Sequence, residues 1–408
     1  MPTRIGRLMA IGALLLVLVL TGCSSADDSA TGAGDSDTGP ATTESPDADP
    51  APTSASGDPD SSTSDSAPSS SASTEGSTTD TTLRSPAPSG GWEVHDTDGD
   101  CQCADGSEFV YFSETLDPEK VMLYFQGGGA CFNEMMCQFS GGSYFSSTSR
   151  DNTPANTGIF DRSNPANPLA DYSVVFVPYC TGDVHLGDAT AEYGELTVEH
   201  RGYANARHAA DHVIENFPDA SEVLVTGSSA GGVPAPLFGG ILADEFPDAD
   251  VAVLADASGG YPSNPGVNGF IGGLWGTEEN IPDWPETQGL DSATWGIPDL
   301  FVHAGNHAPQ VRMARYDNAW DSVQVQFSAL AGVGAEGLPA VLDENEDLAE
   351  DAGVDLDVYI APGDDHTILG SPGMYDLEVE GVGFLDWLTT FVEGGSPGDV
   401  RCVECEQP

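Results

Sequence analysis

The sequence VLVTGSSAGG spans residues 223–232, and the rest of the chain is organised around it. Its first three residues are apolar and two are β-branched, which is typical of the end of a buried strand. Residues 227–231 then fit the pattern G-x-S-x-G, with Ser229 at its centre. That pattern indicates a sharp strand-to-helix turn that lifts a serine hydroxyl above the sheet edge. The alternative is a turn of small residues without chemistry.

The first 22 residues have the composition of an export signal. Arg4 and Arg7 give a basic start, and residues 11–20 form an apolar run that is too short for a comfortable membrane span. Cys23 directly follows two small residues, which resembles a bacterial lipobox. This implies that residues 1–22 are removed by cleavage and that a lipid is attached to Cys23. The alternative is a plain secretory signal with an incidental cysteine.

Residues 23–90 consist mostly of Ser, Thr, Asp, Pro, Gly and Ala. Such a segment cannot bury enough apolar surface to offset its chain entropy, so we predict a disordered tether that holds a domain off the membrane. Residues 91–408 contain apolar runs and aromatic residues without an internal repeat or a second linker. They are predicted to form one α/β domain.

The charge balance is extreme, with 66 acidic residues against 11 basic ones and a net charge of −55. This composition excludes nucleic-acid binding. Lys120 is the only lysine, and residues 343–357 are densely acidic. The excess predicts adaptation to high salt, where screening removes the repulsion between acidic groups.

Seven cysteines follow Cys23, and outside the cytoplasm disulfides are their default state. Cys131 and Cys137 lie in one loop and can pair with each other. Cys101 and Cys103 lie near the start of the domain, and Cys402 and Cys405 lie at its end. Disulfides from the first group to the second would join the two ends of the domain. The alternative is a zinc site of the form C-x-C…C-x-x-C. Cys180 is then predicted to be a free buried thiol.

A glycine-rich loop follows a strong predicted strand. Residues 121–126 are apolar nearly throughout, and residues 127–133 read GGGACFN. Three glycines leave backbone N–H groups bare, and a loop of this kind can donate to an oxyanion together with the residue after the nucleophile. The candidate donors are Gly128, Gly129 and Ala230. A glycine-rich turn of no special purpose is the alternative.

Further strands are predicted at 173–177 and 251–255, the second ending at Asp256, which we interpret as a structural carboxylate. Residues 259–297 are rich in Gly, Pro and Trp. They are predicted to be irregular and to form a wall or lid over a pocket.

A serine nucleophile needs a base, and the base needs an orienting acid. The chain order serine, acid, histidine selects His366, which follows a predicted strand at 357–361. The acid is expected after the preceding strand, 311–316. Asp317 stands at the end of that strand and is the predicted acid, with Asp321 as the alternative.

Together these residues resemble the pectin acetylesterase/Notum family of carboxylesterases. The resemblance is carried by YFQGGGACFN (124–133), VPYC (177–180) with Asp183, GSSAGG (227–232), and Asp317 with His366. It implies an α/β-hydrolase-like fold with a mostly parallel central sheet flanked by helices. It also implies Ser229 as nucleophile, Asp317 as acid, His366 as base, and Gly128, Gly129 and Ala230 as oxyanion donors.

Two features differ from the Notum branch. Gly129 stands where that branch has a tryptophan, and the chain has far fewer cysteines. Both differences favour a bacterial esterase acting on acetylated, pectin-like polysaccharide over a lipid-removing activity. Asp183 and His185 are candidate substrate contacts, although His185 is equally well explained as a surface histidine.

The sequence therefore predicts a secreted serine carboxylesterase that is monomeric, anchored to the membrane through Cys23, and independent of metal or organic cofactor. The alternative is a catalytically inactive, carbohydrate-binding surface lipoprotein of the same fold.

Overall fold

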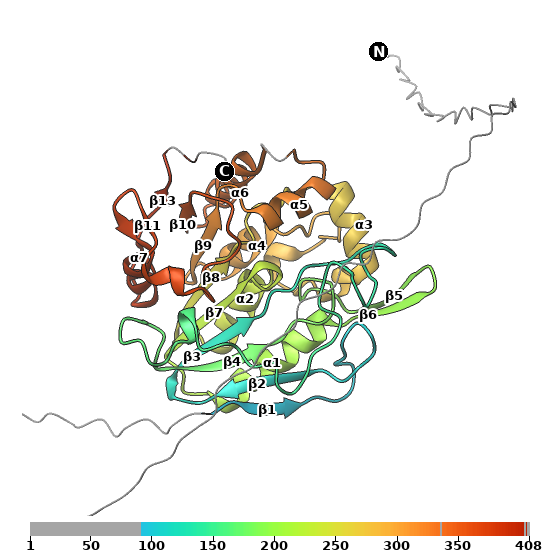
Figure 1. The fold of residues 1–408 in the computed structure, drawn as a ribbon, viewed down its shortest axis with the longest axis horizontal. Helices are drawn as coiled ribbons and strands as arrows, with labels where there is room; N and C mark the ends of the chain where they lie inside the picture. The colour runs from blue at the N-terminus through green and yellow to red at the C-terminus, as the bar shows by residue number, and fades with distance from the viewer. Residues whose placement is uncertain (1–90, 335–336, 404, 406–408) are drawn as a thin grey trace, which may run out of the picture. The chain divides into compact units, whose positions relative to one another are not determined.

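The computed structural model describes residues 91–334, 337–403 and 405. The predicted signal peptide (1–22) and the tether (23–90), with Cys23, lie outside the described residues. A nine-stranded sheet forms the centre of the domain (Figure 1). Its strands are β1 (Glu93–Asp96), β2 (Val110–Glu114), β3 (Asp117–Phe125), β4 (Tyr172–Val177), β7 (Glu222–Ser228), β8 (Asp250–Asp256), β9 (Arg312–Asn318), β10 (Leu356–Ala361) and β13 (Val400–Arg401).

The order of strands across the sheet is β1-β2-β4-β3-β7-β8-β9-β10-β13. The β1–β2 and β2–β4 pairs are antiparallel, and every other neighbouring pair is parallel. This arrangement confirms the predicted α/β-hydrolase-like fold. Because β7, β8, β9 and β10 run parallel, the loops that follow them meet at one edge of the sheet.

Seven α-helices are described: α1 (Gly202–Asn216), α2 (Ala235–Glu245), α3 (Pro265–Trp275), α4 (Asp299–His307), α5 (Ser322–Leu330), α6 (Leu338–Asp351) and α7 (Phe384–Val392). Short 3₁₀ helices are η1 (Gly158–Phe160), η2 (Ser229–Gly231), η3 (Thr277–Asn280), η4 (Pro285–Thr287) and η6 (Pro372–Tyr375). Two hairpins are separate from the main sheet: β5 (Ala189–Tyr193) with β6 (Leu196–His200), and β11 (Glu378–Val379) with β12 (Val382–Gly383).

Side-chain alternation along the strands divides the core into two layers. Leu123 and Val225 belong to one hydrophobic cluster together with residues of α1, α2, α4 and α6. Tyr124 and Leu224 are their neighbours in the chain, and they belong to the other cluster with Trp387 of α7. The sheet is therefore buried on both faces, which explains the nearly continuous apolar runs of its central strands.

The predicted strands are confirmed to within a few residues at their ends. Helix α1 begins only at Gly202, because residues 196–200 pair with β5 as an antiparallel strand. The segment 259–297 was expected to be irregular, yet it contains the three-turn helix α3. Asn264 caps that helix, since its side chain accepts hydrogen bonds from the N–H groups of Gly266 and Val267.

Three disulfides are formed, and two of the sequence expectations about them are wrong. Cys131 pairs with Cys137 as predicted. The bridges between the ends of the domain are absent, because β1 and β13 lie at opposite edges of the sheet. The remaining pairs are Cys103 with Cys180 and Cys402 with Cys405, and Cys101 is the free cysteine in place of Cys180.

The paired cysteines cannot form the alternative zinc site, since a disulfide sulfur is not a thiolate ligand. Disulfides persist in oxidising compartments, so these pairs indicate that the domain functions outside the reducing cytoplasm. Within the described ranges, no helix combines the length and apolar character that a membrane crossing requires.

Candidate active site

Ser229 lies at the strained turn that the sequence predicted. Strand β7 ends at Ser228 and η2 begins at Ser229, whose φ of 58° is in the left-handed region. A side chain at Gly227 would overlap the carbonyl oxygen of Gly231, and one at Gly231 would overlap that of Phe125. Both glycines of the G-x-S-x-G pattern are therefore required by close packing of the turn against β3.

The glycine-rich loop after β3 passes directly beside Ser229. A Cβ atom at Gly127 would lie 2.8 Å from the Cβ of Ser229. Gly129 has a φ of 83°, and a side chain there would overlap the carbonyl oxygen of Ser143. Gly129 and Ala230 line the same cavity as Ser229. Gly128 is fixed by its carbonyl, which accepts a hydrogen bond from the N–H of Phe145.

The carboxylate that contacts His366 is Asp321, and not Asp317 as the sequence predicted. The Nδ1 atom of His366 lies 2.7 Å from Oδ2 of Asp321, whose side chain is fully buried. Asp317 still belongs to β9, where it is paired in register with Ile360 of β10. Its side chain is thus fixed on one face of the sheet, whereas Asp321 lies in the loop beyond the strand, within reach of the loop after β10.

Asp317 is linked to the carboxylate of Asp321. Its Oδ2 lies 2.7 Å from Nε of Arg315, two residues earlier on the same face of β9, and both side chains are buried. The atoms of this ion pair are not aligned for a hydrogen bond. Oδ1 of Asp317 accepts hydrogen bonds from the N–H of Gly259 and from Nε2 of Gln324 at 2.8 Å. The same Nε2 donates to Oδ2 of Asp321 at 3.1 Å, so Gln324 connects the two carboxylates.

The loops that carry Asp321 and His366 are joined by their backbones. The N–H groups of Ala319, Trp320 and Ser322 donate to three carbonyls in residues 361–364, at 2.8 to 3.1 Å. Asp321 also caps α5, because its Oδ1 accepts from the N–H groups of Val323 and Gln324. These bonds hold the carboxylate at a fixed position and angle toward the imidazole.

Asp256, which we interpreted from the sequence as a structural carboxylate, links the turn at Ser229 to the loop that carries His366. Its Oδ2 accepts a hydrogen bond from Oγ of Ser228 at 2.6 Å. The same carboxylate accepts from the N–H groups of Ile368 and Leu369 at 3.0 to 3.1 Å. Tyr124 donates in turn to Ser228 at 2.9 Å. Burial raises the pKa of Asp256 to about 6.

The carboxylate of Asp256 thus binds both Ser228, next to Ser229, and the backbone of the loop that carries His366. These hydrogen bonds hold that loop close to the turn at Ser229. Among the hydrogen bonds of the described residues, none joins the Ser229 hydroxyl to His366. Catalytic hydrogen bonds commonly tighten only when substrate is bound.

Backbone strain concentrates around these residues. Six non-glycine residues in the described part of the chain have a positive φ. Three of them, Ser229, Ala257 and Thr367, belong to the loops just described, and Val184 and His185 lie in the loop after β4. Ala257 directly follows Asp256, and Thr367 directly follows His366. Each such conformation costs about 1–3 kcal/mol and persists only where surrounding contacts enforce it, a pattern found at active sites and ligand clamps.

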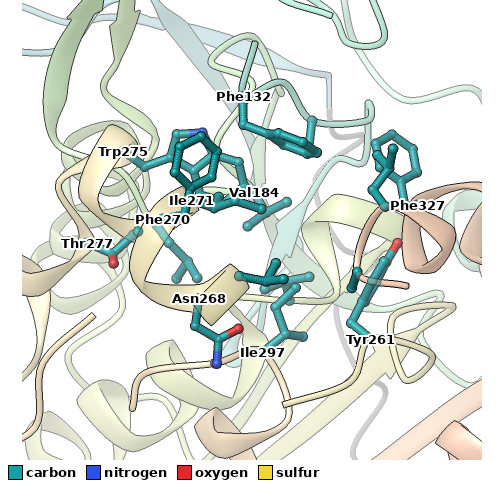
Figure 2. A pocket seen from close by; sticks show the side chains of 18 of the residues that line it. Phe132, Val184, Tyr261, Asn268, Phe270, Ile271, Trp275, Thr277, Ile297 and Phe327 are labelled. Atoms are coloured by element: carbon teal, nitrogen blue, oxygen red, sulfur yellow. The ribbon is translucent and has the colours of Figure 1, made fainter. Parts of the chain in front are cut away.

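A cavity of about 370 Å³ opens beside Ser229. All 24 residues that line it are uncharged, and most are apolar or aromatic. Figure 2 shows Phe270, Ile271 and Trp275 on one side of the cavity, with Tyr261 and Phe327 on the opposite side. The segment 259–297 supplies much of the wall, which agrees with its predicted role. Sequence reasoning did not anticipate that α5 would contribute Phe327 and Leu330.

Asp183 and His185 do not line this cavity, so the structure does not support them as substrate contacts. Asp183 is fully buried and accepts hydrogen bonds from Thr181, from the N–H of His185 and from the N–H of Gly202 at the start of α1. Burial lowers the pKa of His185 to about 4, and its Nε2 donates to the carbonyl of Gln126 at 2.9 Å. Both residues hold the loop after β4 in place.

Two groups of potential metal ligands occur among the described residues. In the first, Cys131 and Cys137 with His200, the cysteines form a disulfide; the second is Glu346, Glu350 and Asp399. Glu346 is already ion-paired with Arg401, and none of the three lines the cavity. The residues around Ser229 present a serine, a histidine and buried carboxylates, a set that suits acyl transfer.

Comparison with known proteins identifies the same region. The family model described as Pectinacetylesterase matches residues 93–269, which include the glycine-rich loop and Ser229. Over these residues the chain is similar to the pectinacetylesterase family. It is also 29% identical over 145 residues to the palmitoleoyl-protein carboxylesterase NOTUM of Schmidtea mediterranea, covering 32% of this chain and 26% of that protein. The human protein of the same name is 28% identical over 166 residues, or 38% of this chain and 33% of its own length.

The chain therefore spans about a quarter to a third of the length of the curated relatives it matches. These relatives are named as carboxylesterases, and the similarity supports an ester hydrolase at a coarse level. Asp321 and His366 lie beyond residues 93–269, so their place in the site rests on the geometry of the structure.

Proposed function

We propose that the chain is a serine carboxylesterase with Ser229 as nucleophile, His366 as base and Asp321 as the acid that orients the base. The contact between Nδ1 of His366 and the buried carboxylate of Asp321 carries this proposal. A carboxylate accepts only, so it keeps the imidazole proton on Nδ1 and leaves Nε2 free to take a proton from the serine hydroxyl.

In the first half of the reaction, Oγ of Ser229 attacks the ester carbonyl while its proton moves to Nε2 of His366. The oxyanion accepts hydrogen bonds from backbone N–H groups of Ala230 and of the loop at Gly128 and Gly129. The alcohol leaves with the proton from His366. Water then attacks the acyl-serine with the same histidine as base, which releases the acid and restores Ser229.

The cavity supports an apolar acyl group as the part of the substrate that binds there. If each heavy atom takes about 30 Å³, as a water molecule does in the liquid, a cavity of about 370 Å³ holds roughly a dozen heavy atoms. An acetyl group would leave most of that space unfilled. An acyl chain of medium length would bury its whole apolar surface, at about 0.8 kcal/mol for each methylene. The name of the relatives, palmitoleoyl-protein carboxylesterases, agrees with an apolar acyl group.

Deacetylation of a pectin-like polysaccharide is the second candidate, and the description of the matching family favours it. A series of esters that share one alcohol and carry acetyl, butyryl, octanoyl or palmitoyl groups distinguishes the two, with acetylated pectin assayed alongside. We expect kcat/KM to increase from acetyl to octanoyl. The highest kcat/KM on the acetyl ester, with release of acetate from pectin, would favour the second candidate instead. Ser229→Ala is the control for background hydrolysis.

Anchoring through Cys23 remains a proposal that rests on the sequence around residues 20–23. Replacing Cys23 with serine removes the lipidated position and leaves the described domain unchanged. The variant should pass from the detergent phase to the aqueous phase in a phase-partition assay. An unchanged partition would show that Cys23 carries no anchor.

A further inference from the structure

Two stretches of the chain that border the cavity carry no charged residue. They are residues 257–277, which include α3, and the described residues 322–334, which include α5. At the chain's overall charged fraction of 19%, the two runs together would hold about six charged side chains. In a chain of net charge −55, these two stretches therefore give the cavity a border without acidic side chains.

Helix α5 is amphipathic in the reverse sense to an ordinary surface helix. Its two buried residues are the polar Gln324 and Ser328, which lie one turn apart. Gln324 faces inward because it binds the carboxylates of Asp317 and Asp321. The apolar side chains are consequently less buried than the polar ones: Val325 and Phe327 are only partly buried against the core, and Leu330 is 54% exposed. A helix that faces water normally has the opposite arrangement.

Helix α3 leaves a second apolar surface at the same cavity. Only Gly272 and Trp275 of its eleven residues are buried, and Phe270 is 61% exposed. Phe270 and Leu330 both line the cavity beside Ser229, so the exposed side chains surround its opening. We call the outward sides of α3 and α5 the uncharged face. Exposed apolar patches of this kind mark interaction sites.

We propose that the uncharged face docks the enzyme onto the surface of an aggregated neutral amphiphile, from which an acyl chain enters the cavity. The inference rests on the proposed function, because it assigns the surroundings of the same substrate. Continuity between the exposed face and the apolar lining of the cavity supports it, since an acyl chain would pass from the aggregate to Ser229 without crossing a charged rim.

The charge of the chain favours a neutral surface over a charged surface or a second copy of the chain as the partner of this face. An anionic surface would be repelled by a chain of net charge −55, and a cationic surface would attract its acidic parts more strongly than a face without charge. A second copy of the chain on this face would cover the opening of the cavity and bring two strongly acidic molecules together. A neutral surface has no electrostatic preference, so apolar contact determines the orientation of the enzyme.

The test adds charge to the uncharged face without changing residues that line the cavity. Gln326 and Ala329 are exposed on α5 and do not line the cavity. The variant, called the α5 pair, therefore combines Gln326→Glu with Ala329→Glu. The matched control, called the control pair, combines Asn216→Glu with Ser221→Glu. Both positions are exposed and precede β7 in the chain, so they lie at the opposite end of that strand from Ser229. Every protein is the full chain with Cys23→Ser, so that the proposed anchor does not contribute to binding.

Three measurements are made on each protein: sedimentation with neutral phosphatidylcholine vesicles, hydrolysis of tributyrin below and above its solubility limit, and hydrolysis of dissolved p-nitrophenyl butyrate. We expect the unmodified face to bind the vesicles and to hydrolyse emulsified tributyrin faster than dissolved tributyrin. The α5 pair should lower both effects about tenfold while changing the rate on p-nitrophenyl butyrate less than twofold, and the control pair should change neither.

Equal losses in the α5 pair and in the control pair would overturn the docking proposal, as would vesicle binding that the α5 pair leaves unchanged. Self-association that the α5 pair abolishes, without vesicle binding, would assign the face to a second copy and also overturn it. Failure of every protein to hydrolyse p-nitrophenyl butyrate would contradict the proposed function. The vesicle measurement needs no turnover and would still decide the docking proposal.

Discussion

Replacing Asp321 with asparagine should abolish catalysis, whereas the same change at Asp317 should weaken the fold. In Asp321→Asn, the side-chain oxygen is retained where it caps α5, because two N–H groups point at it. The amide NH₂ then faces Nδ1 of His366 and forces the ring proton onto Nε2, where it cannot accept from Ser229. In serine triads this tautomer lowers kcat by about 10⁴-fold, or about 5.5 kcal/mol.

Asp317→Asn keeps the oxygen that accepts from Gly259 and Gln324, so the support of Asp321 remains. It places an NH₂ group against Arg315 and leaves that buried guanidinium without its counter-ion. Breaking a buried pair in this way costs about 3–5 kcal/mol. We therefore expect the free energy of unfolding to fall by that amount, while kcat of the folded enzyme changes less than tenfold.

The assay measures kcat on a dissolved neutral ester and the free energy of unfolding in denaturant for both variants. A large loss of kcat in Asp321→Asn, together with a lower free energy of unfolding in Asp317→Asn, would support the assignment of Asp321. A large loss of kcat in Asp317→Asn with an unchanged free energy of unfolding, or near-normal kcat in Asp321→Asn, would refute it.

Three further predictions concern the whole domain. Burial raises the pKa of Asp256 to about 6, so the free energy of unfolding of the wild type, relative to that of Asp256→Asn, should fall by about 2 kcal/mol as the pH rises from about 4 to about 6. Denaturant unfolding at both pH values checks this, and a constant difference between the two proteins would contradict it. Alkylation of unfolded, unreduced residues 91–408 should modify one cysteine, Cys101, and all seven after reduction; more than one before reduction would disprove the pairing. The free energy of unfolding should increase between about 0.01 M and about 1 M salt, as the screening length falls from about 30 Å to about 3 Å; a decrease would refute adaptation to salt.

The sequence predicted the parts of the site that are local in the chain. The turn at Ser229 and the loop at Gly128 are each fixed by a few consecutive residues, whose small size is needed for packing that the pattern itself encodes. His366 could be found because it follows the last long strand. The structure adds the contacts by which these loops meet.

What the sequence left undetermined depends on distances across the fold. Asp317 and Asp321 differ by four positions, and only the pairing of β9 with β10 shows that the first is held on the sheet while the second reaches His366. The pairing of Cys103 with Cys180 depends on the order of strands in the same way. The part of the cavity wall that α5 supplies was also beyond prediction, because α5 turns its polar residues inward and its sequence resembles neither an ordinary surface helix nor a buried one.

The central claim, that Ser229 is an activated nucleophile, is tested most directly by covalent labelling. The full chain is incubated with a fluorophosphonate, and the modified residue is identified by mass spectrometry of its peptides. Ser228→Ala is the matched control, since Ser228 is the adjacent hydroxyl and binds Asp256. The account predicts one label per chain, on Ser229, which persists in Ser228→Ala and disappears in Ser229→Ala. No labelling of the wild type, or labelling that survives Ser229→Ala, would contradict the account and favour an inactive binding protein of the same fold.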